Sequence, residues 1–596
     1  MISHSANVLL LRWSAFASVA FVTASVACSS RDDGFAGPPS ELISIDSGPP
    51  ESAPPSGCEG KKCSRDLHKV VDGCTEAVIE ECGEGRGCSN GSCVTACTSA
   101  ANAQGSIGCS FWTVPPDAHV PTDSSCFAAF VANTWDQPAT VTAELGSETI
   151  DISQSLFRVV PTSDGKVGYE PISGGIPPGE VGILFLSQGD ARPDTAGQMI
   201  ACPPGVKPAF HGILPRAHTT SLYEAFHLST NVPVSAYAIF PYGGADSHTP
   251  SATLLTPSTS WDTSYLIVDP WPYETSIDRK PFVQIVARED TEVRLRPKVD
   301  VTDGVDVTGG PRGSVVKWNL ARGQVLELAQ FERLIGSALE TSHPVGVFGG
   351  HQCAYLPHSE AACDGLYQQI PPVRQWSSAY SAVPYRSRRV SLGSTPPRPE
   401  EVTWQVLAAN EGTVLTYDPA PPFGAPQKLG AGEHVLFSTD QLFGVRSQDA
   451  EHPIYLAVYM SGLSKYSTLG DPDFVNVVPN DQFLDHYVFF VDYTYRDSTL
   501  TLVRRKDANG FHDVNLDCTG TITGWQPLGN DGMIEFAWVD ITRDGQEAGA
   551  CSYGRHEASS DGPFGLYVWG MDDAASYGFP AGAGSRPTSP YLVIVK

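Results

Sequence analysis

The residues most suggestive of chemistry lie in the stretch Pro344–Trp376, PVGVFGGHQCAYLPHSEAACDGLYQQIPPVRQW. His351 stands two positions before Cys353, a spacing that could pair a thiolate nucleophile with a general base. Cys363 follows closely enough to form a disulfide with Cys353, which would remove the thiolate that such chemistry requires. We therefore expect a Cys353–Cys363 disulfide here and no nucleophilic catalysis.

Other residues that could do chemistry are scattered along the chain. Asp300, Asp303 and Asp306 recur every third residue, whereas calcium loops alternate their oxygen ligands and end in a bidentate glutamate, so a solvated turn is expected. Asp561 and Asp572–Asp573 flank an aromatic strand and could supply the two carboxylates of a glycoside hydrolase. Three histidines are isolated and are expected to pack or to form hydrogen bonds: His211, His227 and His556. No nucleophile elbow, phosphate-binding loop or dinucleotide fingerprint occurs, so we expect no enzyme, no cofactor and no metal site.

An internal repeat organises the chain that carries these residues. Strand-like segments that start with proline recur at roughly 110-residue intervals, which is typical of a repeat architecture: Pro233, Pro344, Pro453 and Pro563. Aromatic strands recur in phase with them, beginning at Phe111, Tyr265, Tyr380 and Tyr487. Alternating strands follow in turn, beginning at Phe127, Phe282, Thr403 and Thr499. The pattern predicts four units within a region 101–596, at roughly 106–262, 263–376, 377–485 and 486–584, the first enlarged by an insertion around 151–208.

The same segments predict an all-β fold. Apolar and polar residues alternate with period two, and glycine- and proline-containing turns separate the runs. Each unit has the size of a β-sandwich, which we favour. The alternative is a propeller-like ring, in which the strand FWTVPP at Phe111 could close the circle.

The N-terminal residues predict export. Residues 1–27 have the apolar stretch of a signal peptide, and Ser25-Val26-Ala27-Cys28 resembles the bacterial lipobox, although that pattern prefers leucine where Ser25 stands. The resemblance implies a lipid on Cys28, with Ser30 directing the protein to the outer membrane; the alternative is an ordinary signal peptide and a secreted protein. Residues 28–57 are rich in Pro, Ser and Gly and predict a flexible tether.

The cysteine count predicts an oxidised protein. The chain has 15 cysteines, and setting Cys28 aside leaves an even number. Seven lie in a small module at 58–100, whose core is too small to be stable without covalent links: Cys58, Cys63, Cys74, Cys82, Cys88, Cys93 and Cys97. The others lie in the repeats: Cys109, Cys126, Cys202, Cys353, Cys363, Cys518 and Cys551. Cys518–Cys551 is a natural local pair like Cys353–Cys363. Because each group has seven cysteines, full pairing requires at least one disulfide between the module and the repeats, and we expect Cys97 to form it.

The charge of the chain limits its partners. A formal net charge of −28 opposes binding to nucleic acid and to anionic lipid surfaces, because Lys and Arg must neutralise phosphates there. Membrane contact is therefore expected through the N-terminal lipid alone. The acidity favours neutral or cationic partners.

Several motifs together resemble the bacterial members of the IgG-Fc-binding protein N-terminal domain family. They are GCSFWTV at Gly108, FVANT at Phe130, the Pro344–Trp376 stretch, NLDCTGTITGW at Asn515 and GRHEASSDGPFGLYVWG at Gly554. Gly365 departs from the family pattern, in which many relatives carry histidine. The resemblance implies binding and adhesion rather than catalysis. We expect a surface lipoprotein that presents β repeats to an extracellular protein or polysaccharide; the alternatives are a secreted carbohydrate-active hydrolase and a purely structural envelope protein.

Overall fold

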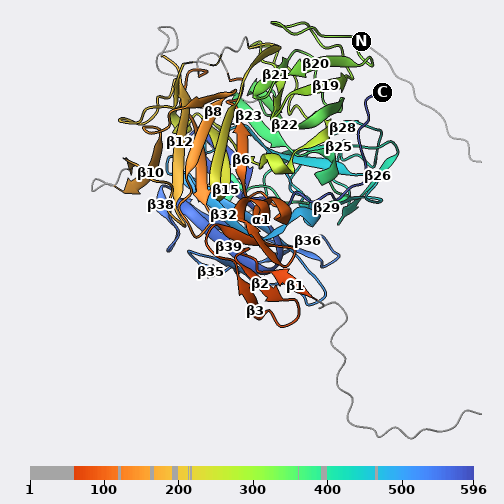
Figure 1. Ribbon diagram of the computed structural model, residues 1–596. Helices are drawn as coiled ribbons and strands as arrows, with labels where there is room; N and C mark the ends of the chain where they lie inside the picture. Colours follow the sequence, from red (N-terminus) through yellow and green to blue (C-terminus); the bar gives the residue numbers. More distant parts are fainter. Residues whose placement is uncertain are drawn as a thin grey trace, which may run out of the picture. The chain divides into compact units, whose positions relative to one another are not determined.

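A computed structural model of the chain (Figure 1) describes most of the part that follows the tether. The described residues are 60–118, 122–161, 167–190, 199–212, 214, 218–247, 249–359, 362–390, 399–462 and 468–596. The predicted signal peptide, the predicted lipobox with Cys28, the predicted tether and Cys58 lie outside them. None of the helices in the described part has the length and apolarity needed to span a bilayer.

The all-β prediction is confirmed, and the same six strand positions, here called A to F, recur four times. Position A holds the aromatic strands β6 (Gly108–Thr113), β17 (Asp262–Leu266), β24 (Ala379–Ala382) and β32 (Leu484–Val491). Position B holds β7 (Phe127–Asn133), β18 (Pro281–Ala287), β25 (Val402–Ala408) and β33 (Asp497–Arg505). Position C, with a short outer strand, holds β8 (Val141–Leu145) with β9 (Glu148–Ile150), β19 (Thr291–Arg296) with β20 (Val316–Leu320), β26 (Thr413–Asp418) with β27 (Lys428–Leu429), and β34 (Val514–Leu516) with β35 (Gly520–Thr521).

The second half of each unit completes its sheets. Position D holds β12 (Val181–Gln188), β21 (Gln324–Ala329), β28 (His434–Thr439) and β37 (Ile534–Arg543). Position E holds β15 (Phe226–Phe240), β22 (Ala338–Ala354), the split strand β29 (Phe443–Ser447) and β30 (Ile454–Met460), and β39 (Gly554–Asp572). Position F holds β16 (Ser251–Leu255), β23 (Asp364–Ile370), β31 (Asp473–Asn476) and β40 (Ala575–Pro580). We call the units first to fourth in this order.

The other strands and the short 3-10 helices lie outside these six positions. The first unit adds β10 (Leu156–Pro161), β11 (Val167–Pro171), β13 (Phe210–His211) and β14 (Ser221–Glu224), and the fourth adds β36 (Gln526–Leu528) and β38 (Gln546–Glu547). Short 3-10 helices are η1 (Gly244–Ser247), η2 (Ser258–Ser260), η3 (Val373–Gln375), η4 (Arg388–Val390) and η5 (Asn480–Gln482). Strand β14 pairs with β21, so it joins the first unit to the second.

The long strand E is shared by two halves of one continuous sheet in the first, second and fourth units, and in the third unit, where E is split, the halves are two separate four-stranded sheets. In the second unit the first part of β22 pairs with β17 and β19, and its second part pairs with β18 and β23. Strand β18 is buried at every position, whereas β19 alternates between buried and half-buried residues. A nearly continuous apolar run therefore marks the half of the sheet that is covered on both faces, and alternation marks the half that has one face partly exposed.

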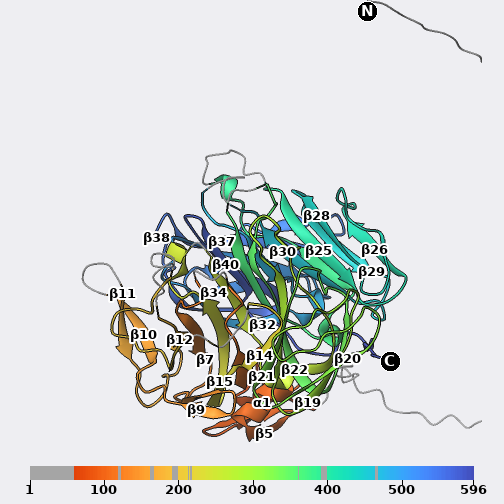
Figure 2. The ribbon, with the colours of Figure 1, turned by 90° about the horizontal axis from the view of Figure 1, so that it is seen from above.

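The F strands bring the four units into a closed ring. Strand β16 packs against β23 and β40, and β31 packs against the same two strands. Gln368 on β23 donates from Nε2 to the carbonyl oxygens of Ala252 (2.9 Å) and Gly578 (3.0 Å), so one buried amide links three units. Figure 2 shows the units as successive sectors, from orange through green and teal to blue. The FWTVPP strand, β6, pairs with β15 inside the first unit, and β40 closes the ring instead.

A small module precedes the ring. It consists of β1 (Lys61–Cys63), β2 (Lys69–Asp72), β3 (Val78–Glu81), β4 (Arg86–Ser89), β5 (Ser92–Thr95) and α1 (Ala96–Ala103). Thr95 caps α1 by accepting the Thr98 N–H at 3.4 Å. The described residues form six disulfides: Cys63–Cys88, Cys82–Cys93, Cys97–Cys109, Cys126–Cys202, Cys353–Cys363 and Cys518–Cys551. Cys97–Cys109 is the covalent link between module and ring, and Cys74 is exposed.

Replacing Cys353 with serine is expected to cost about 2–3 kcal/mol of unfolding free energy, because the bridge to Cys363 closes a short loop. Thermal melting under oxidising conditions measures the loss. Unchanged melting of the variant would show that this bridge contributes nothing.

Candidate functional site

A cavity of about 550 Å³ opens between the third and fourth units. One wall is formed by residues 384–387 and 399–400 of the third unit, and the other by β36, β37 and the residues before them in the fourth. The lining residues are Pro384, Tyr385, Arg386, Ser387, Pro399, Glu400, Leu442, Thr523, Gly524, Gln526, Phe536, Trp538 and Asp540. We call this cavity the groove.

Strand β37 supplies the aromatic wall of the groove. Successive residues of a strand point to opposite faces, so Phe536, Trp538 and Asp540 share one face. The rings of Phe536 and Trp538 pack edge to face at 4.9 Å between centroids. Trp538 Nε1 donates to the carbonyl oxygen of Pro384 at 2.9 Å, which fixes the indole across the boundary between units. The groove thus has a fixed aromatic wall in which Phe536 is buried and Trp538 is half-buried.

The polar end of the groove carries two carboxylates that both have arginine partners. Asp540 forms ion pairs with Arg386 and with Arg543, the latter at 3.2 Å. Glu400 is buried with Arg388, whose Nε lies 3.0 Å from Glu400 Oε1. Burial and then the Glu400 charge raise the pKa of Tyr385 well above its usual value. Because the charges compensate one another, the arrangement suits binding of a polar, uncharged surface better than acid–base catalysis.

The other carboxylates considered from the sequence lie elsewhere. Asp561 is exposed and pairs with Arg65 at 2.9 Å, and Asp572 accepts the backbone N–H of Arg496. Asp300 and Asp303 accept backbone N–H groups within their own loop, as a turn requires. None of these lines the groove.

The histidines occupy structural positions. His351 is buried, and its Nε2 lies 3.0 Å from the carbonyl oxygen of Pro272. His227 stacks on Trp112, and His211 lies 3.7 Å from Asp190.

His556 belongs to the one group of candidate metal ligands in the described residues, with Asp517 and Cys518. Cys518 is bound in a disulfide and offers no thiolate.

Several other tryptophans are buried: Trp112, Trp135, Trp271, Trp376 and Trp569 are at most 6% exposed. The sequence pattern does not single out Trp538 as a surface aromatic. The alternation in IEFAWVD places Phe536, Trp538 and Asp540 on one face, and this was the available signal. The sequence gives no sign that this face of the strand lies next to residues 384–387 and 399–400.

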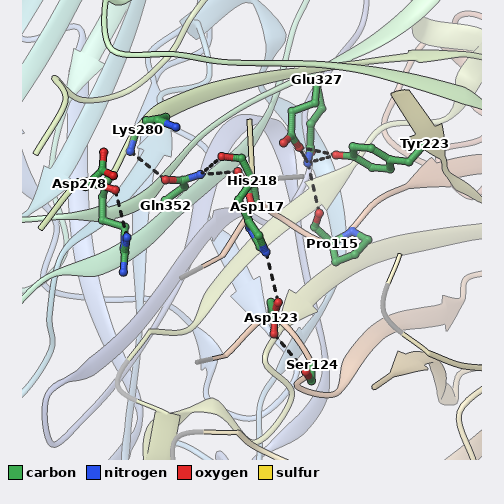
Figure 3. A network of polar contacts seen from close by, with 12 residues as sticks. Pro115, Asp117, Asp123, Ser124, His218, Tyr223, Asp278, Lys280, Glu327 and Gln352 are labelled. Atoms are coloured by element: carbon green, nitrogen blue, oxygen red, sulfur yellow. Dashed lines mark hydrogen bonds and ion pairs between the residues drawn. The ribbon is translucent and has the colours of Figure 1, made fainter. Parts of the chain in front are cut away.

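A second polar cluster, shown in Figure 3, joins the first and second units. His218 lies with Nδ1 2.6 Å from Asp117 and Nε2 3.2 Å from Asp123, both buried. Gln352 Nε2 donates to the second oxygen of Asp117 at 2.6 Å. Nearby, Gln284 Nε2 donates to Tyr223, to Glu327 and to the carbonyl oxygen of Pro115. Since the cluster ties segments of two units together inside the protein, we assign it a structural role.

Comparison with known proteins adds one match. The family model described as "IgGFc binding protein" matches residues 251–570, which is more than half of the chain and includes both walls of the groove. No curated protein sequence and no solved structure matches the chain.

Proposed function

The chain belongs to the IgGFc binding protein family, and from this premise we propose that it is an exported, non-enzymatic adhesion protein that binds an extracellular protein or polysaccharide. Disulfides persist in oxidising compartments, so the six bridges support export. In this proposal Cys28 carries the lipid that holds the protein on the outer membrane, and the tether separates the ring from the surface.

The groove is the proposed contact site. Its volume falls in the range of ligand pockets, and it combines an aromatic surface with a few fixed polar groups. Trp538 is the observation that carries the assignment, because a half-exposed, hydrogen-bonded indole offers a large contact area with little loss of side-chain entropy. Gln526 and Thr523 place hydrogen-bonding groups along the same groove.

A hydrolase remains the second candidate because Glu400 and Asp540 line one cavity. Glycoside hydrolysis needs one carboxylic acid that donates a proton and one free carboxylate. Glu400 and Asp540 are both paired with arginines, so neither is the free carboxylate that this reaction needs. Release of reducing sugar from a polysaccharide, lost in an Asp540→Asn variant, would favour the hydrolase over the binding protein.

Replacing Trp538 with alanine is expected to weaken ligand capture at least about tenfold, as for an interface anchor. The disulfide-intact chain is immobilised and exposed to culture matrix, cell-surface extract and immunoglobulin Fc, the ligand class in the family's name. Bound material is quantified for wild type and variant. Phe331→Ala removes an exposed aromatic ring from the second unit and serves as the matched control.

Capture that survives in the Trp538 variant but not in the control would exclude the groove as the contact site. Absence of any saturable partner would favour a purely structural envelope protein.

A further inference from the structure

A second cavity, of about 360 Å³, lies between the second and third units and the C-terminal segment. Arg296 at the end of β19, together with Lys298 and Arg312 from the loop that follows, brings three cationic side chains to it. We call it the cationic pocket. It lies outside the groove, with which it shares no lining residue.

These three cations stand out in a strongly acidic chain. The chain has 66 Asp and Glu residues against 38 Lys and Arg, so carboxylate partners are abundant. Within the described residues, no salt bridge involves Arg296, Lys298 or Arg312, and the buried Nε of Arg296 has no hydrogen-bond partner. Three cations without an ion-pair partner among the described residues therefore bring positive charge to one cavity.

The carboxylates nearest to Lys298 already have other partners. Glu433 accepts the N–H of Gly430 at 2.7 Å, and Glu411 accepts the N–H of Ala431 at 3.0 Å. Lys298 itself donates from Nζ to the carbonyl oxygen of Ala431 at 2.7 Å. Burial lowers the pKa of Lys298, and the charges of Glu433 and Glu411 oppose that lowering.

The C-terminal segment adds apolar lining to the pocket and is fixed in place. Tyr591, Val593 and Ile594 line it, and Ile594 is 57% exposed. The Val593 N–H donates to Ser264 Oγ at 2.8 Å, which holds the C-terminal segment against the second unit. A ligand for this pocket therefore needs an anionic group on one side and an apolar face on the other.

We propose that the cationic pocket binds an acidic sugar residue of an extracellular polysaccharide, with its carboxylate or sulfate against Arg296, Lys298 and Arg312. Arginine forks bind such anions through paired hydrogen bonds, and the less polar face of a pyranose ring packs on Tyr591 and Ile594. The net charge of −28 does not prevent this, because at physiological salt charges beyond about 8 Å are largely screened while the pocket cations are in contact. The choice of a sugar rests on the proposed function, whereas the anion site rests on the pocket alone.

Calorimetric titration of the intact chain tests the proposal. The probes are an oligomer of hexuronic acid, a sulfated oligomer and a neutral oligomer of equal length. We expect both acidic oligomers to bind more tightly than the neutral one, and their affinity to fall with added salt. The double variant Arg296→Gln/Arg312→Gln should bind at least about tenfold more weakly. Arg312→Gln alone, an exposed change, keeps the test valid if the double variant does not fold.

Two controls separate this proposal from the groove. Lys428→Gln removes an exposed cation elsewhere in the third unit, and Trp538→Ala removes the groove's indole; both should leave binding of the acidic oligomers unchanged. Equal affinity of the neutral oligomer, or full affinity in the arginine variants, would overturn the cationic pocket. Binding lost only in the Trp538 variant would overturn it as well and support the groove.

Discussion

Replacing Arg388 with methionine is expected to lower the free energy of unfolding by about 3–5 kcal/mol, because it leaves the buried Glu400 carboxylate without its countercharge. Both side chains are at most 1% exposed. Arg388 also donates to the Ser461 carbonyl oxygen at 3.0 Å and to Ser461 Oγ at 2.7 Å, so several acceptors lose their donor together. Chemical denaturation of the variant and the wild type measures the loss.

The double variant Arg388→Met/Glu400→Gln separates lost charge compensation from lost packing. Removing both charges should restore a large part of the stability, since an uncompensated buried charge is the main cost. If the double variant is no more stable than Arg388→Met, packing around the arginine dominates. Ligand capture by the groove can be measured in the same variants as a second test. Glu400 lines the groove, so capture requires the polar end of the groove to keep its structure.

Acidification from pH 7 to pH 4.5 is expected to destabilise the protein by about 3 kcal/mol through His351 alone. Burial, above all, lowers the pKa of His351 to about 3. Its Nδ1 accepts the N–H of Cys353 at 3.2 Å, so a proton on this nitrogen would face another N–H. The unfolded chain takes up a proton near pH 6.5 and the folded chain does not, so stability is full above pH 6.5 and declines down to about pH 3.

A His351→Gln variant tests this linkage because its side chain is uncharged at every pH and can still donate to the Pro272 carbonyl oxygen. Lowering the pH from 7 to 4.5 should destabilise the wild type by about 3 kcal/mol more than the variant. His343→Gln, at an exposed position of the same strand, is the control and should leave the pH dependence as it is. Parallel pH profiles for wild type and His351→Gln would refute the prediction.

Much of the local structure follows from the sequence, because strand signals are short-range. The aromatic and alternating segments at Tyr265 and Phe282 form β17 and β18, and the continuous apolar run after Pro344 forms the buried part of β22. The pairing of Cys353 with Cys363 and of Cys518 with Cys551 follows from proximity along the chain. The family resemblance also holds over more than half of the chain.

The arrangement of the units and both cavities could not be derived in this way. The groove joins Arg386 to Asp540, and the cationic pocket joins Arg296 to Tyr591. These contacts depend on how whole sheets pack, and strand periodicity carries no information on that. Trp538 looks like any other strand aromatic until its neighbour across the unit boundary is known.

The closed ring has a consequence for how the protein is made and how it can evolve. Strand β16 needs β40 as a neighbour, and β40 leaves the ribosome, and the export channel, long after β16. The inner edge of the first unit therefore stays uncovered until the last unit has been made. Contacts between such distant parts of the chain favour slow folding, and the exposed strand edge favours aggregation. We expect the protein to depend on chaperones during export. We also expect homologues to keep the number of units fixed and to vary in the loops that connect the strands.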